Sequence, residues 1–159
     1  MEKKYLAKIV FVFAALLCIN FTAFSQCKAK QIAKGCKDNI KKPYKYDSFA
    51  VNELLFDTKS KEIEVQFTAF QGQRYKIVFC SSGFDEKVTM NVFDKSRRIK
   101  NNRHKLYDST QGIDSDFWSF EPPKSGNYFI VYSIPPSVDG KPKTGCIVML
   151  IAYTEPDSE

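Results

Sequence analysis

A strict two-residue alternation of apolar and polar side chains is the feature that most constrains how this chain can fold. In the segment from Lys61 to Phe70 the apolar members are Ile63, Val65, Phe67 and Ala69, and the polar members are Glu62, Glu64, Gln66 and Thr68. Alternating side chains point to opposite faces of a β-strand, whereas a helix would mix the two kinds on every face. The segment therefore predicts a strand with one buried and one solvated face.

Further short apolar runs follow along most of the chain. The predicted strands span residues 49–56, 61–70, 74–81, 87–94, 106–107, 117–121, 128–134 and 146–153. Gly, Pro, Asn and Ser residues occupy the gaps, and no helical pattern separates the strands after Pro43. The short gap between Phe70 and Arg74 predicts that the two flanking strands form a hairpin.

These patterns favour an all-β fold over a parallel α/β fold, which needs a helix between successive strands. We expect an antiparallel two-sheet β-sandwich, jelly-roll-like, with seven or eight strands and a short N-terminal helix. A length of 159 residues suits one domain. The predicted division is a signal peptide at 1–25, a basic N-terminal helix at 26–45, the β-sandwich domain at 46–153 and a polar tail at 154–159.

The first 25 residues have the features of a signal peptide. A lysine-rich start precedes an apolar stretch of 11 residues, Ile9–Ile19, and Ala23 and Ser25 are the small residues expected before cleavage at Gln26. The stretch falls well short of the roughly 20 apolar residues that a membrane-spanning helix needs. We therefore expect a secreted or periplasmic protein that has no transmembrane anchor after cleavage.

Cysteine usage agrees with export. Four cysteines follow the predicted cleavage site, namely Cys27, Cys36, Cys80 and Cys146, and an even number predicts two disulfides. One candidate arrangement is Cys80–Cys146 with Cys27–Cys36. In the other, each N-terminal cysteine bonds a strand cysteine, because a helix starting at Cys27 would place Cys36 about 13 Å away, too far for a disulfide. Both arrangements remain open, with a slight preference for the second.

Positive charge is concentrated in two segments. The first cluster comprises Lys28, Lys30, Lys34, Lys37, Lys41, Lys42 and Lys45, and the second comprises Lys95, Arg97, Arg98, Lys100, Arg103 and Lys105. Such clusters attract anionic surfaces, which for an exported protein means lipopolysaccharide, an acidic polysaccharide or an acidic protein rather than nucleic acid. The second cluster provides the predicted anion-binding residues, and ordinary solvated loop and helix faces are the alternative.

Residues suited to catalysis or metal binding are few. His104 is the only histidine, it lies between Arg103 and Lys105, and a Gly-x-Ser-x-Gly motif is absent. Asp114 and Asp116 offer carboxylates for Ca²⁺, but the full calcium-loop pattern is missing. We therefore predict no catalytic residue, no cofactor and no metal, with these two aspartates as weak calcium candidates.

Trp118 is the only tryptophan. With Tyr44, Tyr46 and Tyr107 it offers an aromatic platform for a sugar ring. Its place between Phe117 and Phe120 favours a core position instead, since only alternate residues of a strand face inward.

A family resemblance rests on residues 117–136, FWSFEPPKSGNYFIVYSIPP. This stretch resembles the F-x-F-x-P-x-x-S-G-x-Y module of bacterial pre-peptidase C-terminal domains and, more loosely, the GOLD-type sandwiches of secretory-pathway cargo proteins. Residues 71–94 fit the same layout, and the whole chain looks like small secreted proteins of Bacteroidota. The resemblance covers roughly residues 49–153, and it implies a β-sandwich that accompanies other proteins without a catalytic residue of its own.

The leading functional hypothesis is a secreted, non-catalytic binding or accessory module of the bacterial cell envelope. Its expected partner is an envelope or extracellular protein or an anionic polysaccharide. The first alternative is a polyanion- or glycan-binding protein that uses the basic clusters. The second is a small secreted hydrolase that uses Asp114 or Asp116.

Overall fold

The computed structural model describes residues 27–111 and 117–155. In order along the chain the elements are α2 (Ala29–Lys37), β1 (Lys45–Phe56), β2 (Lys61–Ala69), β3 (Arg74–Ser82), β4 (Thr89–Phe93), β5 (Lys105–Asp108), β6 (Phe117–Phe120), β7 (Gly126–Ile134) and β8 (Lys143–Thr154). Within these residues no helix has the length and apolar character that a membrane span requires.

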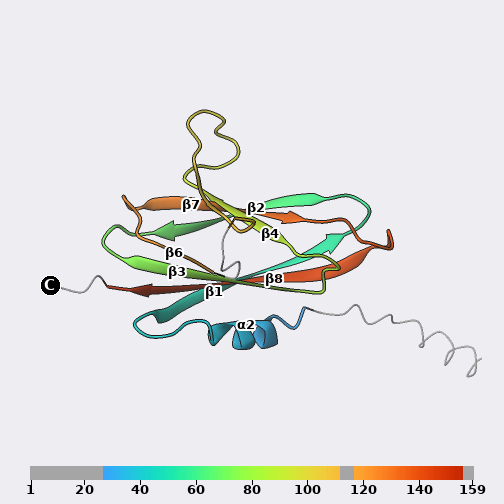
Figure 1. Cartoon of the computed structure of the whole chain (residues 1–159), viewed down its shortest axis with the longest axis horizontal. Helices are drawn as coiled ribbons and strands as arrows, with labels where there is room; N and C mark the ends of the chain where they lie inside the picture. The colour runs from blue at the N-terminus through green and yellow to red at the C-terminus, as the bar shows by residue number, and fades with distance from the viewer. Residues whose placement is uncertain (1–26, 112–116, 156–159) are drawn as a thin grey trace, which may run out of the picture.

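The strands form two four-stranded antiparallel sheets that lie face to face (Figure 1). One sheet, called the helix-side sheet, has the order β1-β8-β3-β6, and the other, called the loop-side sheet, has the order β2-β7-β4-β5. The pairs β1·β8, β2·β7, β3·β6 and β4·β5 are nested along the chain, as in a long hairpin rolled into two layers. This is the jelly-roll arrangement, so the predicted fold class is confirmed.

The main core fills the space between the sheets. It is built from the inward-facing residues of both layers, including Ile77 and Phe79 of β3 and Ile130 and Tyr132 of β7. The alternation in β2 behaves as predicted, because Phe67 and Ala69 are buried while Thr68 between them is exposed.

A second, smaller cluster lies on the outer face of the helix-side sheet. Val78, Val148 and Leu150 point away from the main core and pack under α2, which contributes Cys36 and its apolar neighbours. Strands β3 and β8 are therefore apolar on both faces.

Two disulfides fasten α2 to this sheet. Cys27 bonds Cys146 of β8, and Cys36 bonds Cys80 of β3, with Cα–Cα distances of 5.7 and 6.3 Å. The second of the two predicted arrangements is thus confirmed, and the pairing of Cys27 with Cys36 is wrong.

The predicted hairpin between the strands at 61–70 and 74–81 is also wrong. Strand β2 belongs to the loop-side sheet and β3 to the helix-side sheet, so the turn around Gly72 crosses between layers. The outer faces explain the separation: β2 carries polar residues outward, whereas β3 presents Val78 to the helix. Strand β2 therefore lies in the sheet whose outer face is open to solvent, and β3 lies in the sheet whose outer face is covered by α2.

Several element ends differ from the sequence prediction. The helix spans Ala29–Lys37 rather than the predicted 26–45, and it ends where the Asn39 and Ile40 N–H groups donate to the Cys36 and Lys37 carbonyls in tight turns. Strand β1 begins at Lys45 instead of Phe49, and an irregular register near Asp47 interrupts the alternation there.

Candidate functional site in the β4–β5 loop

The second basic cluster lies on one loop, residues 94–104, together with the start of β5. The loop joins β4 to β5 at the edge of the loop-side sheet and projects beyond the sandwich, as the olive segment of Figure 1 shows. The first basic cluster surrounds α2 on the outer face of the other sheet. The two clusters therefore lie on opposite faces of the molecule, and either can contact a partner without the other.

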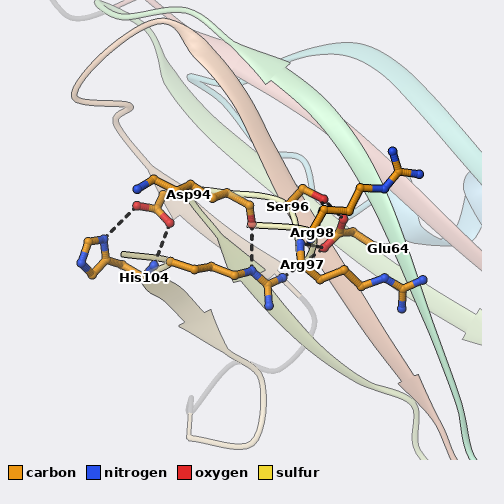
Figure 2. A network of polar contacts seen from close by, with 8 residues as sticks. Glu64, Asp94, Ser96, Arg97, Arg98 and His104 are labelled. Atoms are coloured by element: carbon orange, nitrogen blue, oxygen red, sulfur yellow. Dashed lines mark hydrogen bonds and ion pairs between the residues drawn. The ribbon is translucent and has the colours of Figure 1, made fainter. Parts of the chain in front are cut away.

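Glu64 of β2 anchors the loop (Figure 2). Its carboxylate accepts hydrogen bonds from the Ser96 hydroxyl at 2.6 Å and the Arg97 backbone N–H at 2.8 Å, and Arg103 Nη2 donates to it at 3.1 Å. Glu64 and Arg103 side chains are only 12% and 19% exposed. A charge-assisted network of this kind, shielded from water, gives the loop a defined shape.

Arg103 is the second anchor of the loop. Its Nε donates to the Lys95 carbonyl at 2.8 Å, and its guanidinium lies 3.5 Å from the centroid of the Phe93 ring. Together with the Glu64 ion pair, these contacts use the donors and the flat face of the guanidinium. Arg103 therefore holds the loop together and has little capacity left for an external anion.

Asp94 and His104 close the base of the loop. Asp94 accepts from the His104 backbone N–H at 2.7 Å, and its second oxygen lies 2.9 Å from His104 Nδ1. Partial burial raises the pKa of Asp94, but these hydrogen bonds from His104 outweigh it and leave the pKa below its ordinary value. The His104 side chain is mainly exposed, and its contacts with Asp94 close the turn.

Lys105 is also paired within the protein. Its ammonium donates to Asp108 at 2.8 Å. This hydrogen bond and those from Thr110 lower the pKa of Asp108 to about 2. Of the six predicted anion-binding residues, Arg103 and Lys105 thus have internal partners.

Arg97, Arg98 and Lys100 are the exposed cations of the loop. In Figure 2 the side chains of Arg97 and Arg98 extend away from the Glu64 network. Within the described part of the chain neither they nor Lys100 form an ion pair. Ile99, which is 50% exposed, lies between them in the sequence. We call Arg97, Arg98, Ile99 and Lys100 the basic tip.

Sequence reasoning found the cations of this site but missed Glu64. The carboxylate looked like an ordinary member of the polar face of β2, and Asp94 looked like the end of a strand. Nothing in the local pattern reveals that a loop 30 residues later folds across β7 onto that face. The one sequence signal for a residue such as Glu64 is composition. A loop segment with six cations needs carboxylates from elsewhere in the chain as counter-charges if it is to be ordered.

The remaining candidates are placed as follows. Asp114 and Asp116 lie outside the described residues, so the calcium and hydrolase hypotheses gain no structural description. No three His, Cys, Asp or Glu side chains within residues 27–111 and 117–155 are grouped to hold a metal ion.

The aromatic platform does not form. Trp118 is buried, with its ring stacked 3.9 Å from that of Phe120, and Tyr107 packs beside it. Tyr46 lies instead under Lys37 of α2, on the other side of the helix-side sheet. The core reading of Trp118 is correct.

Comparisons with known proteins give limited information. No family model matches this sequence, and no curated protein matches it significantly. Among solved structures, PliG of Aeromonas hydrophila, a periplasmic inhibitor of g-type lysozyme, is 17% identical with a TM-score of 0.43, over 65% of this chain and 85% of that one. PliG of Salmonella Typhimurium, an inhibitor of the same type, is 16% identical with a TM-score of 0.39, over 67% of this chain and 93% of that one. At these low values, function has to be assigned from the residues of this chain.

Proposed function

We propose that this protein is an exported, non-catalytic binding module of the cell envelope that contacts an anionic partner through its basic tip. The observation that carries the proposal is that some charged residues fix the loop while others remain exposed to solvent. Glu64 and Asp94 fix the loop, while Arg97, Arg98 and Lys100 are exposed without an internal counter-charge among the described residues. The two disulfides support export, because such bonds persist in oxidising compartments.

A preorganised loop suits recognition better than a mobile one. Ordering of side chains and backbone costs free energy on binding, and a loop that is ordered beforehand avoids much of that cost. Arginine is also the residue best suited to carboxylate, sulfate and phosphate groups, since its guanidinium donates to two oxygens at once. Arg97 and Arg98 therefore offer an anionic partner both electrostatic attraction and paired hydrogen-bond donors.

The test compares two charge-reversed variants of the mature chain. In one, Arg97, Arg98 and Lys100 are changed to Glu; in the other, Lys28, Lys30 and Lys34 of the α2 cluster are changed to Glu. Both variants lose the same net charge, so only the position of the change differs. Binding to labelled heparin and to labelled poly-glutamate is measured by fluorescence anisotropy at low and high salt.

We expect the loop variant to bind at least tenfold more weakly than the unchanged protein and the α2 variant to bind within about threefold of it. Binding should also fall as salt rises, because exposed charges are screened. Equal losses in the two variants would mean that net charge alone drives binding, and loss only in the α2 variant would assign the contact to the helix. A preference for heparin or for poly-glutamate distinguishes a polysaccharide from an acidic polypeptide as the partner.

A further inference from the structure

The lysines on and around α2 form an exposed cationic surface. Residues 27–44 contain a single acid, Asp38, and six lysines, all of them exposed: Lys28, Lys30, Lys34, Lys37, Lys41 and Lys42. Within the described part of the chain none of the six forms an ion pair. Lys30, Lys34 and Lys37 are spaced by four and three residues, so they share one side of the helix. We call these three the lysine stripe.

The lysine stripe lies on the side of α2 that borders β1. Lys37 Nζ is 4.1 Å from the centroid of the Tyr46 ring, and Tyr46 belongs to β1. Gln31 and Gly35, which are on a different side of the helix, line a cavity together with residues of β3. Helix α2 itself covers the outer face of the helix-side sheet, and β1 is the edge strand of that sheet (Figure 1). The lysine stripe is therefore next to an open sheet edge.

Strand β1 presents exposed apolar side chains on the same outer face. Val51 pairs with Val148 of β8, which packs under α2, and paired residues of neighbouring strands project to the same face. Phe49 and Leu55 are an even number of residues from Val51 in a stretch of regular register, so they share its face. Phe49 is 47% exposed, Val51 38% and Leu55 56%. We call these three residues the apolar stripe.

The two stripes together select the kind of partner. Lysines alone would attract any polyanion, but large exposed apolar side chains gain nothing from a hydrated polysaccharide. The surface of an anionic bilayer offers phosphate groups for the lysines and an apolar boundary for the side chains of β1. We propose that the lysine stripe and the apolar stripe form one surface that binds an anionic phospholipid bilayer. This surface lies opposite the basic tip and does not depend on the proposed function.

Glu53 is an acid within the apolar stripe. It lies between Val51 and Leu55, it is exposed, and it pairs with Cys146 of β8, so it shares their outer face. A carboxylate at this place is repelled by anionic headgroups. Its removal should therefore strengthen binding to an anionic bilayer, a gain that a folding defect cannot imitate.

The first test measures the contribution of charge. Cosedimentation of the mature chain is compared between vesicles of equal parts phosphatidylglycerol and phosphatidylcholine and vesicles of phosphatidylcholine alone. We expect binding to the mixed vesicles to be about tenfold tighter or more, and replacement of the lysine stripe by Gln to weaken it about tenfold. The matched control removes the same charge from the basic tip by changing three residues to Gln, Arg97, Arg98 and Lys100. It should bind the mixed vesicles within about threefold of the unchanged protein.

The second test measures the contribution of the apolar stripe. The double variant Val51→Thr with Leu55→Gln should bind the mixed vesicles about three- to tenfold more weakly, because it inserts less apolar surface. The matched control is Val138→Thr with Leu106→Gln, which changes the same exposed residue types in the β7–β8 connection and in β5. This control should bind within about twofold, and Glu53→Gln should bind about twofold more tightly or better than the unchanged protein.

Four outcomes would overturn the proposal. The first is equal binding to the two kinds of vesicle, and the second is loss of vesicle binding only in the basic-tip variant, which would place the lipid contact there. The third is equal vesicle binding by the apolar-stripe variant and its control. The fourth is weaker binding by Glu53→Gln. If dextran sulfate binding requires the lysine stripe while vesicle binding ignores the apolar stripe, the lysines serve a soluble polyanion instead.

Discussion

Glu64 receives hydrogen bonds from three residues of one loop, so a single carboxylate sets the geometry of the basic tip. Replacement by Gln keeps the size of the side chain but removes its charge. We expect Glu64→Gln to lower the free energy of unfolding by about 1–3 kcal/mol, as is usual when partly buried charged hydrogen bonds are lost. Urea denaturation of the mature protein measures the change.

The matched control is Glu62→Gln, on the same face of β2. Glu62 is exposed and contacts Ser133 only at 3.4 Å, so its replacement should change stability by no more than about 0.5 kcal/mol. If the loop cations bind an anion as proposed, Glu64→Gln should also weaken heparin binding although it raises the net charge. Stronger heparin binding by Glu64→Gln would show that charge matters more than loop geometry.

Two buried tyrosines differ in their hydrogen bonds, and their replacement should change the free energy of unfolding differently. Tyr75 accepts from the Phe70 N–H and donates to Gln73, whereas Tyr132 has no partner among the described residues. Tyr75→Phe should therefore cost about 1–2 kcal/mol, while Tyr132→Phe should be neutral or stabilising. Thermal or urea unfolding of the two variants checks this, and an equal loss in both would reveal a partner for the Tyr132 hydroxyl.

Helix α2 is the element that depends most on covalent links. It packs on the helix-side sheet through a small apolar cluster, and both of its disulfides lead to strands of that sheet. In the chain-entropy description, closing loops of 119 and 44 residues contributes about 5 and about 4 kcal/mol. The disulfides therefore add covalent links to the apolar contacts between the helix and the sheet.

Replacement of all four cysteines by Ala should release α2 before it disrupts the sandwich. Hydrogen exchange followed by mass spectrometry should show protection lost in Ala29–Lys37 and largely retained in β7, which has no cysteine. The single pair Cys36→Ala and Cys80→Ala is a milder version of the same change. Protection that falls equally in α2 and β7 would show that the helix and the sheets unfold as one unit.

The sequence predicts the strands of this fold better than their partners. Alternation is a local property, so β2 and β7 could be located from their own residues. Pairing depends on what covers each face, and the covering of β3 by α2 becomes visible only in three dimensions. The prediction of a hairpin around Gly72 was wrong for this reason.

The candidate site follows the same rule. The cations of the loop are evident as a run in the sequence, but their sorting into exposed and anchored members is not. Arg103 and Arg97 have the same charge, and they differ because one faces Phe93 and Glu64 while the other points away. That distinction arises from contacts between segments that lie far apart in the chain.

At the scale of the whole molecule, one ion cluster joins two connections at the same end of the sandwich. Lys143 at the start of β8 bonds Asp85 of the β3–β4 connection at 2.8 Å and pairs with Asp139 of the β7–β8 connection at 3.1 Å. Hydrogen bonds from Lys143 and the Val138 N–H lower the pKa of Asp85, and those from Ser137, Lys141 and Lys143 lower that of Asp139. The same carboxylates raise the pKa of Lys143, with Asp85 as the main cause.

These shifts predict how stability varies with pH. Carboxyl groups with lowered pKa values stabilise the fold above about pH 4, and that stabilisation is lost as the pH falls through their folded-state values. Lys143, with a raised pKa, stabilises the fold below about pH 10 and loses that contribution as the pH rises through its folded-state value. Urea midpoints of the unchanged protein should therefore decline at both extremes.

Lys143→Met should reduce the decline at both extremes relative to Lys141→Met. Lys141 is an exposed neighbour in the same connection, and its replacement gives the same net charge. Urea midpoints measured between about pH 2 and pH 11 provide the comparison. Identical pH profiles for the two variants would mean that the Lys143 cluster does not contribute to the pH dependence.

The place of β8 has a consequence for biogenesis. This last strand lies between β1 and β3, so the helix-side sheet lacks its centre until the C-terminal residues are present. A polypeptide threaded through a secretion channel N-terminus first cannot complete that sheet while its final segment is still inside the pore. Cys27 likewise cannot form its native disulfide until Cys146 has emerged. In an exported chain, the topology would therefore leave the helix-side sheet incomplete and Cys27 without its native disulfide until β8 had emerged.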